Sequence, residues 1–391
     1  MTVSCHSVGN VRLGAGLWRA MLLAALPPAW LVTTFHALAR HFRVSPAVTA
    51  LPELQLLERL CEQGAAHVQR QHLGDVQVGG RTFPLLALCL GNPSPQVPAI
   101  GFFGGVHGLE RIGAELVMAF LASLVSRLRW DSSLHQLLES VRIVFMPLVN
   151  PGGLWRGTRA NPAGVDLMRN APLESAAQVP LFVGGQRLSA KLPWYRGPAG
   201  AAMEQESQAL CDCVRRELLT HEHVLTVDCH SGFGLADRIW FPFAHTAQPI
   251  AHLAEMHALC EILDQTHAQH AYVFEPQSRQ YLTHGDLWDY LYTEASARAE
   301  QVFLPLTLEM GSWLWVKKNP RQLFTKHGMF NPQIGHRHRR VLRRHLAWLD
   351  FLLRAAAGMP RWLPQPEQRA EQERRALLRW YQRGDQPGVK V

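Results

Sequence analysis

His107 and Glu110 stand three residues apart, directly after an apolar run and the glycine pair Gly104-Gly105. On a turn between a strand and a helix, an imidazole and a carboxylate at this spacing can face one point at the rim of a sheet. Two histidines and one carboxylate are a common ligand set of zinc in hydrolases, with a fourth position left for water. The pair alone is a weak signal, because short motifs arise by chance in a chain with 20 histidines. A glutamate is also favoured in the first turn of a helix.

Two further apolar runs end on side chains of the same kind. The run 224–229 ends at His230, the run 302–308 ends at Glu309, and a glycine follows each within two residues. Chance explains three such endings much less well than it explains one. The sequence therefore predicts one zinc ion held by His107, Glu110 and His230.

Glu309 is the candidate general base. Zinc lowers the pKa of its bound water toward about 7, and a carboxylate outside the ligand set must then take the proton and return it to the leaving amine. Arg159 and Arg169 are candidates for holding the oxyanion of the tetrahedral state and a substrate carboxylate. The structural alternative for all three residues is an ordinary ion pair.

The scaffold that must position these residues follows from hydrophobic patterning. Strands are expected at a hairpin over 76–90 and at 98–103, 141–149, 224–229, 239–243 and 302–309. Helices are expected at 51–71, 112–128, 203–219, 250–270 and 334–357, with a turn at 150–153 and an irregular loop over 171–200. Apolar strands that alternate with helices predict a single α/β domain with a mixed, partly parallel central sheet.

The catalytic domain is expected to span 46–360, between an N-terminal extension, 1–45, and a polar C-terminal tail, 361–391. Pro27-Pro28 would break a membrane-spanning helix in the extension. Ala37-Leu38-Ala39 resembles a signal-peptidase site. A periplasmic location thus remains an alternative to the expected cytoplasmic one.

Composition narrows the class of partner. The chain carries a net charge of +8, and 47% of its 391 residues are hydrophobic, which excludes a wholly disordered protein. Much of the positive charge lies in 336–345, before the apolar residues Trp348, Leu349 and Leu352, which predicts an amphipathic helix with a solvated basic face rather than an anionic partner. Neither nucleic-acid binding nor stable membrane insertion is expected, and the oligomeric state is open. Seven cysteines without a CxxC pair fit a reducing compartment.

Several motifs follow one another in a characteristic order. They are His107-x-x-Glu110, Asn150-Pro-x-Gly153, Thr158-Arg159, Gly164-Val-Asp166-x-x-Arg169-Asn170, Asp228-x-His230-Ser231 and Thr307-x-Glu309. This order resembles the zinc carboxypeptidase family, the relatives of carboxypeptidase A, over residues 95–315. The resemblance implies a mixed sheet of about eight strands flanked by helices, one zinc ion, and hydrolysis of a C-terminal peptide bond.

The resemblance also implies roles for individual residues. His107, Glu110 and His230 match the zinc ligands, and Glu309 matches the general base. Arg159 matches the arginine that stabilises the oxyanion. Arg169, Asn170 and Tyr281 match substrate-binding residues. Arg169 matches the arginine that holds the terminal carboxylate of the substrate, and Tyr281 matches the tyrosine that covers the substrate.

Three features depart from the family pattern. Met168 stands where the family usually has asparagine, and Leu109 stands where the digestive members have arginine. The His-Gly-x-Glu form is closer to deacylase relatives such as succinylglutamate desuccinylase and aspartoacylase. The loop 181–197 has no counterpart that we can map, and it is either a lid or an ordinary surface loop.

Three functions therefore remain open. The first is a metallocarboxypeptidase that acts on a peptide. The second is a zinc amidase or deacylase that acts on an N-acyl amino acid or a cell-wall peptide. The third is a zinc-binding protein without catalytic activity. A non-catalytic zinc-binding protein is disfavoured by Glu309, because a metal scaffold does not need a general base. A serine hydrolase is disfavoured because the chain has no Gly-x-Ser-x-Gly motif.

Overall fold

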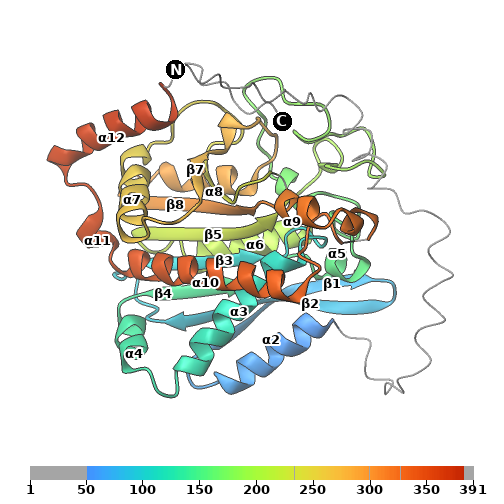
Figure 1. Ribbon diagram of the computed structural model, residues 1–391, viewed down its shortest axis with the longest axis horizontal. Coiled ribbons are helices and arrows are strands. Elements are labelled where there is room, and N and C mark those ends of the chain that lie inside the picture. Colours follow the sequence, from blue (N-terminus) through green and yellow to red (C-terminus); the bar gives the residue numbers. More distant parts are fainter. Residues whose placement is uncertain (1–50, 233, 299, 326, 383–391) are drawn as a thin grey trace, which may run out of the picture. The chain divides into compact units, whose positions relative to one another are not determined.

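The computed structural model describes residues 51–232, 234–298, 300–325 and 327–382. These residues form one α/β domain around an eight-stranded mixed sheet, as the sequence predicts (Figure 1). The expected extension 1–45, with its signal-like site, lies outside the described residues.

The strand order is β1-β2-β4-β3-β5-β8-β6-β7. The strands are β1 (Gln69–Val78), β2 (Arg81–Gly91), β3 (Ala99–Gly104), β4 (Arg142–Met146), β5 (His223–Ser231), β6 (Arg238–Phe241), β7 (Val273–Pro276) and β8 (Val302–Met310). β4, β3, β5 and β8 run parallel to one another. β1 with β2, β2 with β4, and β6 with β8 pair antiparallel, and β6 with β7 pairs parallel.

Helices cover both faces of the sheet. α3 (Arg111–Arg127) and α10 (Gly335–Ala357) pack on one face, and α6 (Gln205–Glu217) and α8 (Leu287–Ser296) lie on the other (Figure 1). β3 and β4 are buried at every position, and apart from Arg142 at the start of β4 neither strand carries a charged or polar side chain. The remaining helices are α2 (Pro52–Gln63), α4 (Ser132–Glu139), α5 (Pro151–Arg156), α7 (Leu253–Thr266), α9 (Trp313–Lys318), α11 (Met359–Trp362), α12 (Pro366–Trp380), and the short 3-10 helices η2 (Leu167–Arg169), η3 (Gln277–Arg279) and η4 (Pro320–Phe324).

The carboxyl ends of β3, β5 and β8 lie side by side at one edge of the sheet. In the register of β5 and β8, His230 stands opposite Glu309, so both side chains project from the same face of the sheet. Gly104, the last residue of β3, stands opposite Cys229. The turn after β3 therefore begins one strand away from His230.

Two glycines allow the turn after β3 and the helix that follows it to pack closely. A Cβ at Gly108 would collide with the backbone of Gly153 in α5, and a Cβ at Gly113 would collide with the carbonyl oxygen of Cys229 in β5. The close approach of α3 to β5 thus depends on the missing side chain of Gly113.

The structure differs from the sequence prediction at several element ends. The helix predicted over 51–71 ends already at Gln63, and the residues from Gln69 onward belong to β1 instead. The turn predicted at 150–153 is instead the start of α5, where the side chain of Asn150 accepts a hydrogen bond from Gly153 N at 2.7 Å.

The segment expected as a polar tail contains a packed helix. α12 lies against α7, and its residues Ala376 and Trp380 are buried. The sequence of α12 is mostly polar, so the burial of these two residues was not apparent from the sequence.

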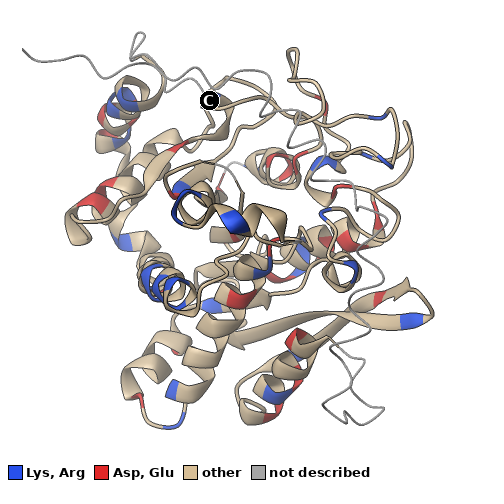
Figure 2. Ribbon diagram, turned by 45° about the vertical axis from the view of Figure 1, so that its right-hand side comes forward, with Lys and Arg blue, Asp and Glu red and all other residues tan. Residues whose placement is uncertain are grey.

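The basic segment 336–345 forms the first half of α10, which is amphipathic as predicted. Trp348, Leu349 and Leu352 are buried, whereas Arg339, Arg340 and Arg343 are exposed. Figure 2 marks the arginines of this helix in blue. Within the described part of the chain, no helix combines the length and the hydropathy needed to span a bilayer.

Gly113→Ala should destabilise the fold, because the added methyl group must displace α3 from the backbone of β5. We expect a loss of about 1–3 kcal/mol in the free energy of unfolding, measured by urea denaturation. Gly335→Ala is the matched control, because the nearest atom to its Cβ is 3.8 Å away at the start of a helix. Equal stabilities of the two variants would contradict the close-packing interpretation.

Candidate metal centre

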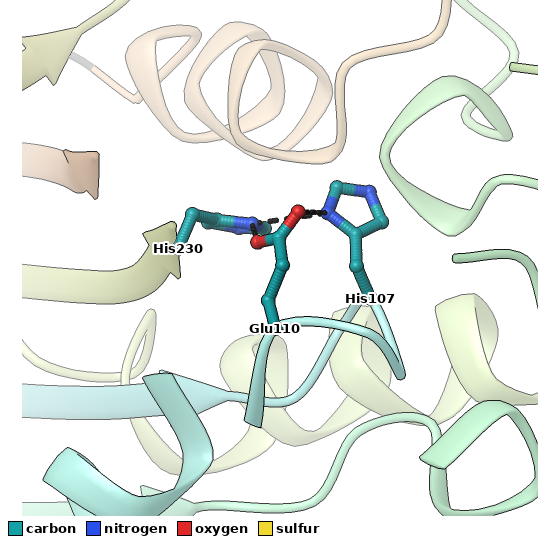
Figure 3. A group of neighbouring side chains, drawn as sticks. All are labelled: His107, Glu110 and His230. Atoms are coloured by element: carbon teal, nitrogen blue, oxygen red, sulfur yellow. Dashed lines mark hydrogen bonds and ion pairs between the residues drawn. The ribbon is translucent and has the colours of Figure 1, made fainter. Parts of the chain in front are cut away.

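His107, Glu110 and His230 converge on one point (Figure 3). Nδ1 of His107 lies 2.9 Å from Oε1 of Glu110, Nδ1 of His230 lies 3.0 Å from Oε2, and the two Nδ1 atoms are 3.2 Å apart. Two nitrogens bound tetrahedrally to zinc at about 2.0–2.1 Å would be about 3.3 Å apart. The three residues, each at most 4% exposed, therefore have the spacing of ligands around one ion.

Each ligand is placed by the end of a secondary-structure element. His107 lies in the turn after β3, and Glu110 immediately precedes α3 without using its side chain to cap that helix. His230 is the penultimate residue of β5. The N–H of Ser231 donates to Oε2 of Glu110 at 3.1 Å, which ties the carboxylate to the end of β5.

Asn331, from the segment before α10, closes the turn that carries two ligands. Its Oδ1 accepts from the N–H of Ile112 at 2.9 Å, and its Nδ2 donates to the carbonyl of Leu109 at 2.7 Å. The sequence reasoning did not identify Asn331, because the residue lies more than 200 positions from the turn and belongs to no local motif. It holds the first turn of α3 to the ligand turn.

A buried aspartate faces the far nitrogen of each histidine. Asp166 Oδ1 lies 3.0 Å from His107 Nε2, and Asp228 Oδ2 lies 2.8 Å from His230 Nε2. Metal-binding histidines commonly have such a partner, which holds the proton on the outer nitrogen and turns the other lone pair toward the ion. Trp288 Nε1 in turn donates to Asp228 at 2.9 Å.

The sequence reasoning assigned no role to these two aspartates. The Asp228-x-His230 spacing held a usable signal, because residues two apart on a strand share a face. No comparable local signal links Asp166 to His107, 59 positions away.

Arg159 is a fixed cation beside the ligands. Its Nε donates to Asp166 Oδ2 at 2.7 Å, and its Nη1 donates to Glu110 Oε1 at 3.1 Å. Burial acts to lower the pKa of Arg159, but Asp166 and Glu110 outweigh it and raise that pKa. Burial likewise acts to raise the pKa of Asp166, while Arg159 and His107 hold it well below its ordinary value.

Glu309 lies beside the end of β5. Its side chain is largely buried, and its Oε1 would be only 2.8 Å from a Cβ at Gly232. Gly232 thus leaves the space that the carboxylate occupies. Because Glu309 stands opposite His230 in the sheet, its carboxylate is on the same face as that imidazole.

The structure also brings Arg169 and Tyr281 to this region. Arg169 is 4% exposed, and its Nε and Nη1 donate to the carbonyls of Val183 and Met168 at 3.2 and 3.1 Å. Burial raises the pKa of Tyr281, the positive charge of Arg169 opposes this effect, and the negative charge of Glu309 adds to it.

Asn170 has backbone partners on both sides of its amide. Its Nδ2 donates to the carbonyl of Arg196 at 3.1 Å, and its Oδ1 accepts from the N–H of Glu204 at 2.6 Å. The residue therefore ties the loop after η2 to the start of α6, and its contact with a substrate stays a prediction.

Comparison with known proteins places these features in a family context. The zinc carboxypeptidase family model matches residues 63–314. Carboxypeptidase B of Rattus norvegicus is 28% identical over 192 residues, which cover 46% of this chain and 45% of that protein. Carboxypeptidase E of Caenorhabditis elegans is 34% identical over 95 residues, covering 21% of this chain and 20% of the relative. The chain thus matches less than half the length of either relative.

Solved structures share the fold. Thrombin-activatable fibrinolysis inhibitor matches with a TM-score of 0.58 and 19% identity, over 77% of this chain and 72% of that one. The bovine form, in complex with tick carboxypeptidase inhibitor, matches with a TM-score of 0.56 and 18% identity, over 78% and 95%.

His107→Ala and His230→Ala should each abolish stoichiometric zinc binding, because either change leaves two of the three converging ligands. Zinc per chain is measured by atomic absorption after dialysis, with His223→Ala as the control at a partly buried histidine of the same strand. We expect about one zinc in the control and almost none in the other two variants. Full zinc content in either ligand variant would rule out this ligand set.

Asp228→Asn should weaken zinc binding by about 10–100-fold, because an amide orients the His230 ring less well than a carboxylate does. Competition with a chromophoric chelator measures the affinity, and circular dichroism verifies the fold. An unchanged affinity would mean that the contact does not orient the ligand.

Proposed function

Because the chain belongs to the zinc carboxypeptidase family, we propose that it is a metallocarboxypeptidase that hydrolyses the C-terminal amide bond of a peptide. The observation that carries this proposal is the convergence of His107, Glu110 and His230 with a separate carboxylate, Glu309, on the neighbouring strand. A purely structural metal site would use its ligands alone. A catalytic site also needs a base outside the ligand set.

The side chains divide the reaction among them. A zinc ion held by the three ligands would polarise the substrate carbonyl and make a water molecule acidic. Glu309 takes the proton of that water and delivers it to the leaving amine. Arg159, held in place by Asp166 and Glu110, stabilises the negative charge that develops on the carbonyl oxygen.

Three further residues orient the substrate in this proposal. Arg169 binds its terminal carboxylate, Asn170 supports that contact, and Tyr281 covers the bound residue. The charge of Arg169 acts on the phenol of Tyr281, which supports a division in which both side chains serve one bound residue.

A second candidate is a zinc amidase or deacylase acting on N-acyl amino acids or cell-wall peptides. Met168 favours it, because a thioether cannot hydrogen-bond a carboxylate as an amide does. Arg169 favours it as well, because two of its donors already bind the carbonyls of Val183 and Met168. Both functions use the same ligands, base and oxyanion arginine, and they differ only in what Arg169 recognises.

Product analysis distinguishes the two candidates. The zinc-loaded protein is incubated with acylated tripeptides and with N-acyl amino acids, and mass spectrometry identifies the bond that is cut. We expect release of the C-terminal residue from the tripeptides and little cleavage of those with an amidated C-terminus. Cleavage confined to the acyl group would instead establish the deacylase, and turnover of neither class would refute both.

Glu309→Gln should lower kcat by about 100–10,000-fold, because an amide cannot take the proton from water. Zinc content should stay at the wild-type level, since Glu309 is not among the converging ligands. Zinc analysis and steady-state kinetics on the same preparation check both statements. An unchanged kcat would exclude Glu309 as the base.

A further inference from the structure

The loop 181–197, which has no counterpart that we could map, reaches the candidate metal centre with its C-terminal half. The loop doubles back on itself. Gln186 N donates to the carbonyl of Trp194 at 2.9 Å, and Arg196 N donates to the carbonyl of Gln186 at 2.9 Å. Tyr195 O accepts from the N–H of Asp166 at 2.7 Å, which joins the loop to the segment that positions His107 and Arg159.

The side chain of Gln186 holds the loop in shape. Its Oε1 accepts from the N–H groups of Leu188 and Ser189 at 2.6 and 3.0 Å. Its Nε2 lies within hydrogen-bonding distance of the carbonyls of Ser189, Leu192 and Pro193. Gln186 is 6% exposed, so this amide fills the interior of the loop and satisfies backbone groups that would otherwise be buried without partners.

Trp194 occupies an unusual backbone conformation at the inner end of this loop. Its φ is 59°, in the left-handed region that bulky L-residues rarely adopt. Residues held this way persist only where their surroundings impose the conformation, and they cluster at ligand sites. The indole of Trp194 lies beside Arg159, whose guanidinium carbon is 5.9 Å from the ring centroid. The side chain remains partly exposed.

The same loop also contacts the second arginine of the site. Val183 O accepts from Nε of Arg169 at 3.2 Å. In the proposed function, both Arg159 and Arg169 bind the substrate. The loop contacts Arg169 through the carbonyl of Val183 and Arg159 through the ring of Trp194. An ordinary surface loop would have no reason to contact both.

We propose that Trp194 is a specificity-determining residue that contacts the substrate side chain on the N-terminal side of the scissile bond and selects an aromatic or large apolar group there. The inference rests on the proposed function, in which Arg159 binds the carbonyl oxygen of the bond that is cut. The residue that contributes this carbonyl then lies next to the indole. Asp166 and Glu110 hold the guanidinium of Arg159, and the N–H of Asp166 also holds the backbone of Tyr195, the residue after Trp194.

The chemistry of the indole supports this selection. Its flat apolar face offers contact area to another ring at little loss of side-chain entropy, and aromatic pairs gain beyond simple area burial. The ring lies on one side of the Arg159 guanidinium, and shielding from water there would strengthen the attraction of the guanidinium for a developing oxyanion. An aromatic substrate group stacked on the indole would complete that shielding, whereas an alanine side chain would not.

The test compares Trp194→Ala, Trp194→Phe and the control Leu188→Ala, which changes an exposed side chain at the tip of the same loop. Substrates are acylated dipeptides that differ only in having Phe or Ala before the scissile bond. We expect the ratio of kcat/KM for Phe over Ala to fall about tenfold in Trp194→Ala, mainly through KM. Trp194→Phe should keep most of the preference, and Leu188→Ala should keep all of it.

A purely structural role for Trp194 predicts a different result. If the indole only positions Arg159, then Trp194→Ala lowers kcat for both substrates equally and leaves the ratio unchanged, which would overturn the proposal. Zinc content and circular dichroism verify that Trp194→Ala folds. If it does not fold, the ratio in Trp194→Leu decides, because leucine keeps apolar bulk but offers no ring face.

A failure of the proposed function would be recognised separately. If the wild-type protein cleaves neither dipeptide, the hydrolase assignment fails for this substrate class. Dissociation constants of the same two dipeptides, measured calorimetrically with zinc-loaded protein, then replace the kinetic ratio. Equal constants for the Phe and Ala dipeptides in the wild type would refute the role of Trp194, and tighter binding of the Phe dipeptide that Trp194→Ala abolishes would support it.

Discussion

The close approach of two imidazole nitrogens and a carboxylate inside the protein is the constraint on which the rest of the site depends. The Nδ1 atoms of His107 and His230 are 3.2 Å apart, and each has a buried aspartate on its other side. Glu110, Asp166 and Asp228 together carry three negative charges, and Arg159 supplies one positive charge. Arg159 pairs with Glu110 and Asp166, and a divalent ion held by the three ligands would offset further negative charge. Charges are stable away from water only when they are paired in this way, so the outer carboxylates and Arg159 are as much a part of the metal site as its three ligands.

The sheet delivers these groups to one place by simple means. Parallel neighbours β3, β5 and β8 end at the same edge, and the register of β5 and β8 sets His230 and Glu309 side by side. Helices cover both faces of these strands; His230 and Glu309 are the penultimate residues of β5 and β8, and His107 and Glu110 lie in the turn just beyond β3. Ligands and base therefore come from the scaffold, whereas Trp194 and the contacts of Arg169 come from the long loop. Such a division would let one fold keep its metal centre while the residues around that centre change.

The sequence predicted the class of fold and the residues at strand ends, because apolar runs that stop at His or Glu are local patterns. Asp228 could have been identified in the same way, from its spacing to His230 on one strand. Asn331 and Gln186 could not, because their partners are backbone groups that only the folded chain brings near. Asn150 was interpreted as part of a turn since capping residues and turn residues are of the same types, and α12 was missed because only Ala376 and Trp380 of its mostly polar sequence are buried.

The hydrogen bonds of Asn331 have a consequence for the order in which the protein is made. They join the turn of His107 and Glu110 to a residue that the ribosome adds 219 positions after Ile112. A nascent chain that has just passed Glu309 already contains every proposed ligand and the base, yet the N–H of Ile112 and the carbonyl of Leu109 still lack this partner. The turn can therefore reach its final geometry only late in synthesis. A chain cut short between Glu309 and Asn331 would thus contain all three proposed ligands but lack the two hydrogen bonds that fix the turn carrying His107 and Glu110.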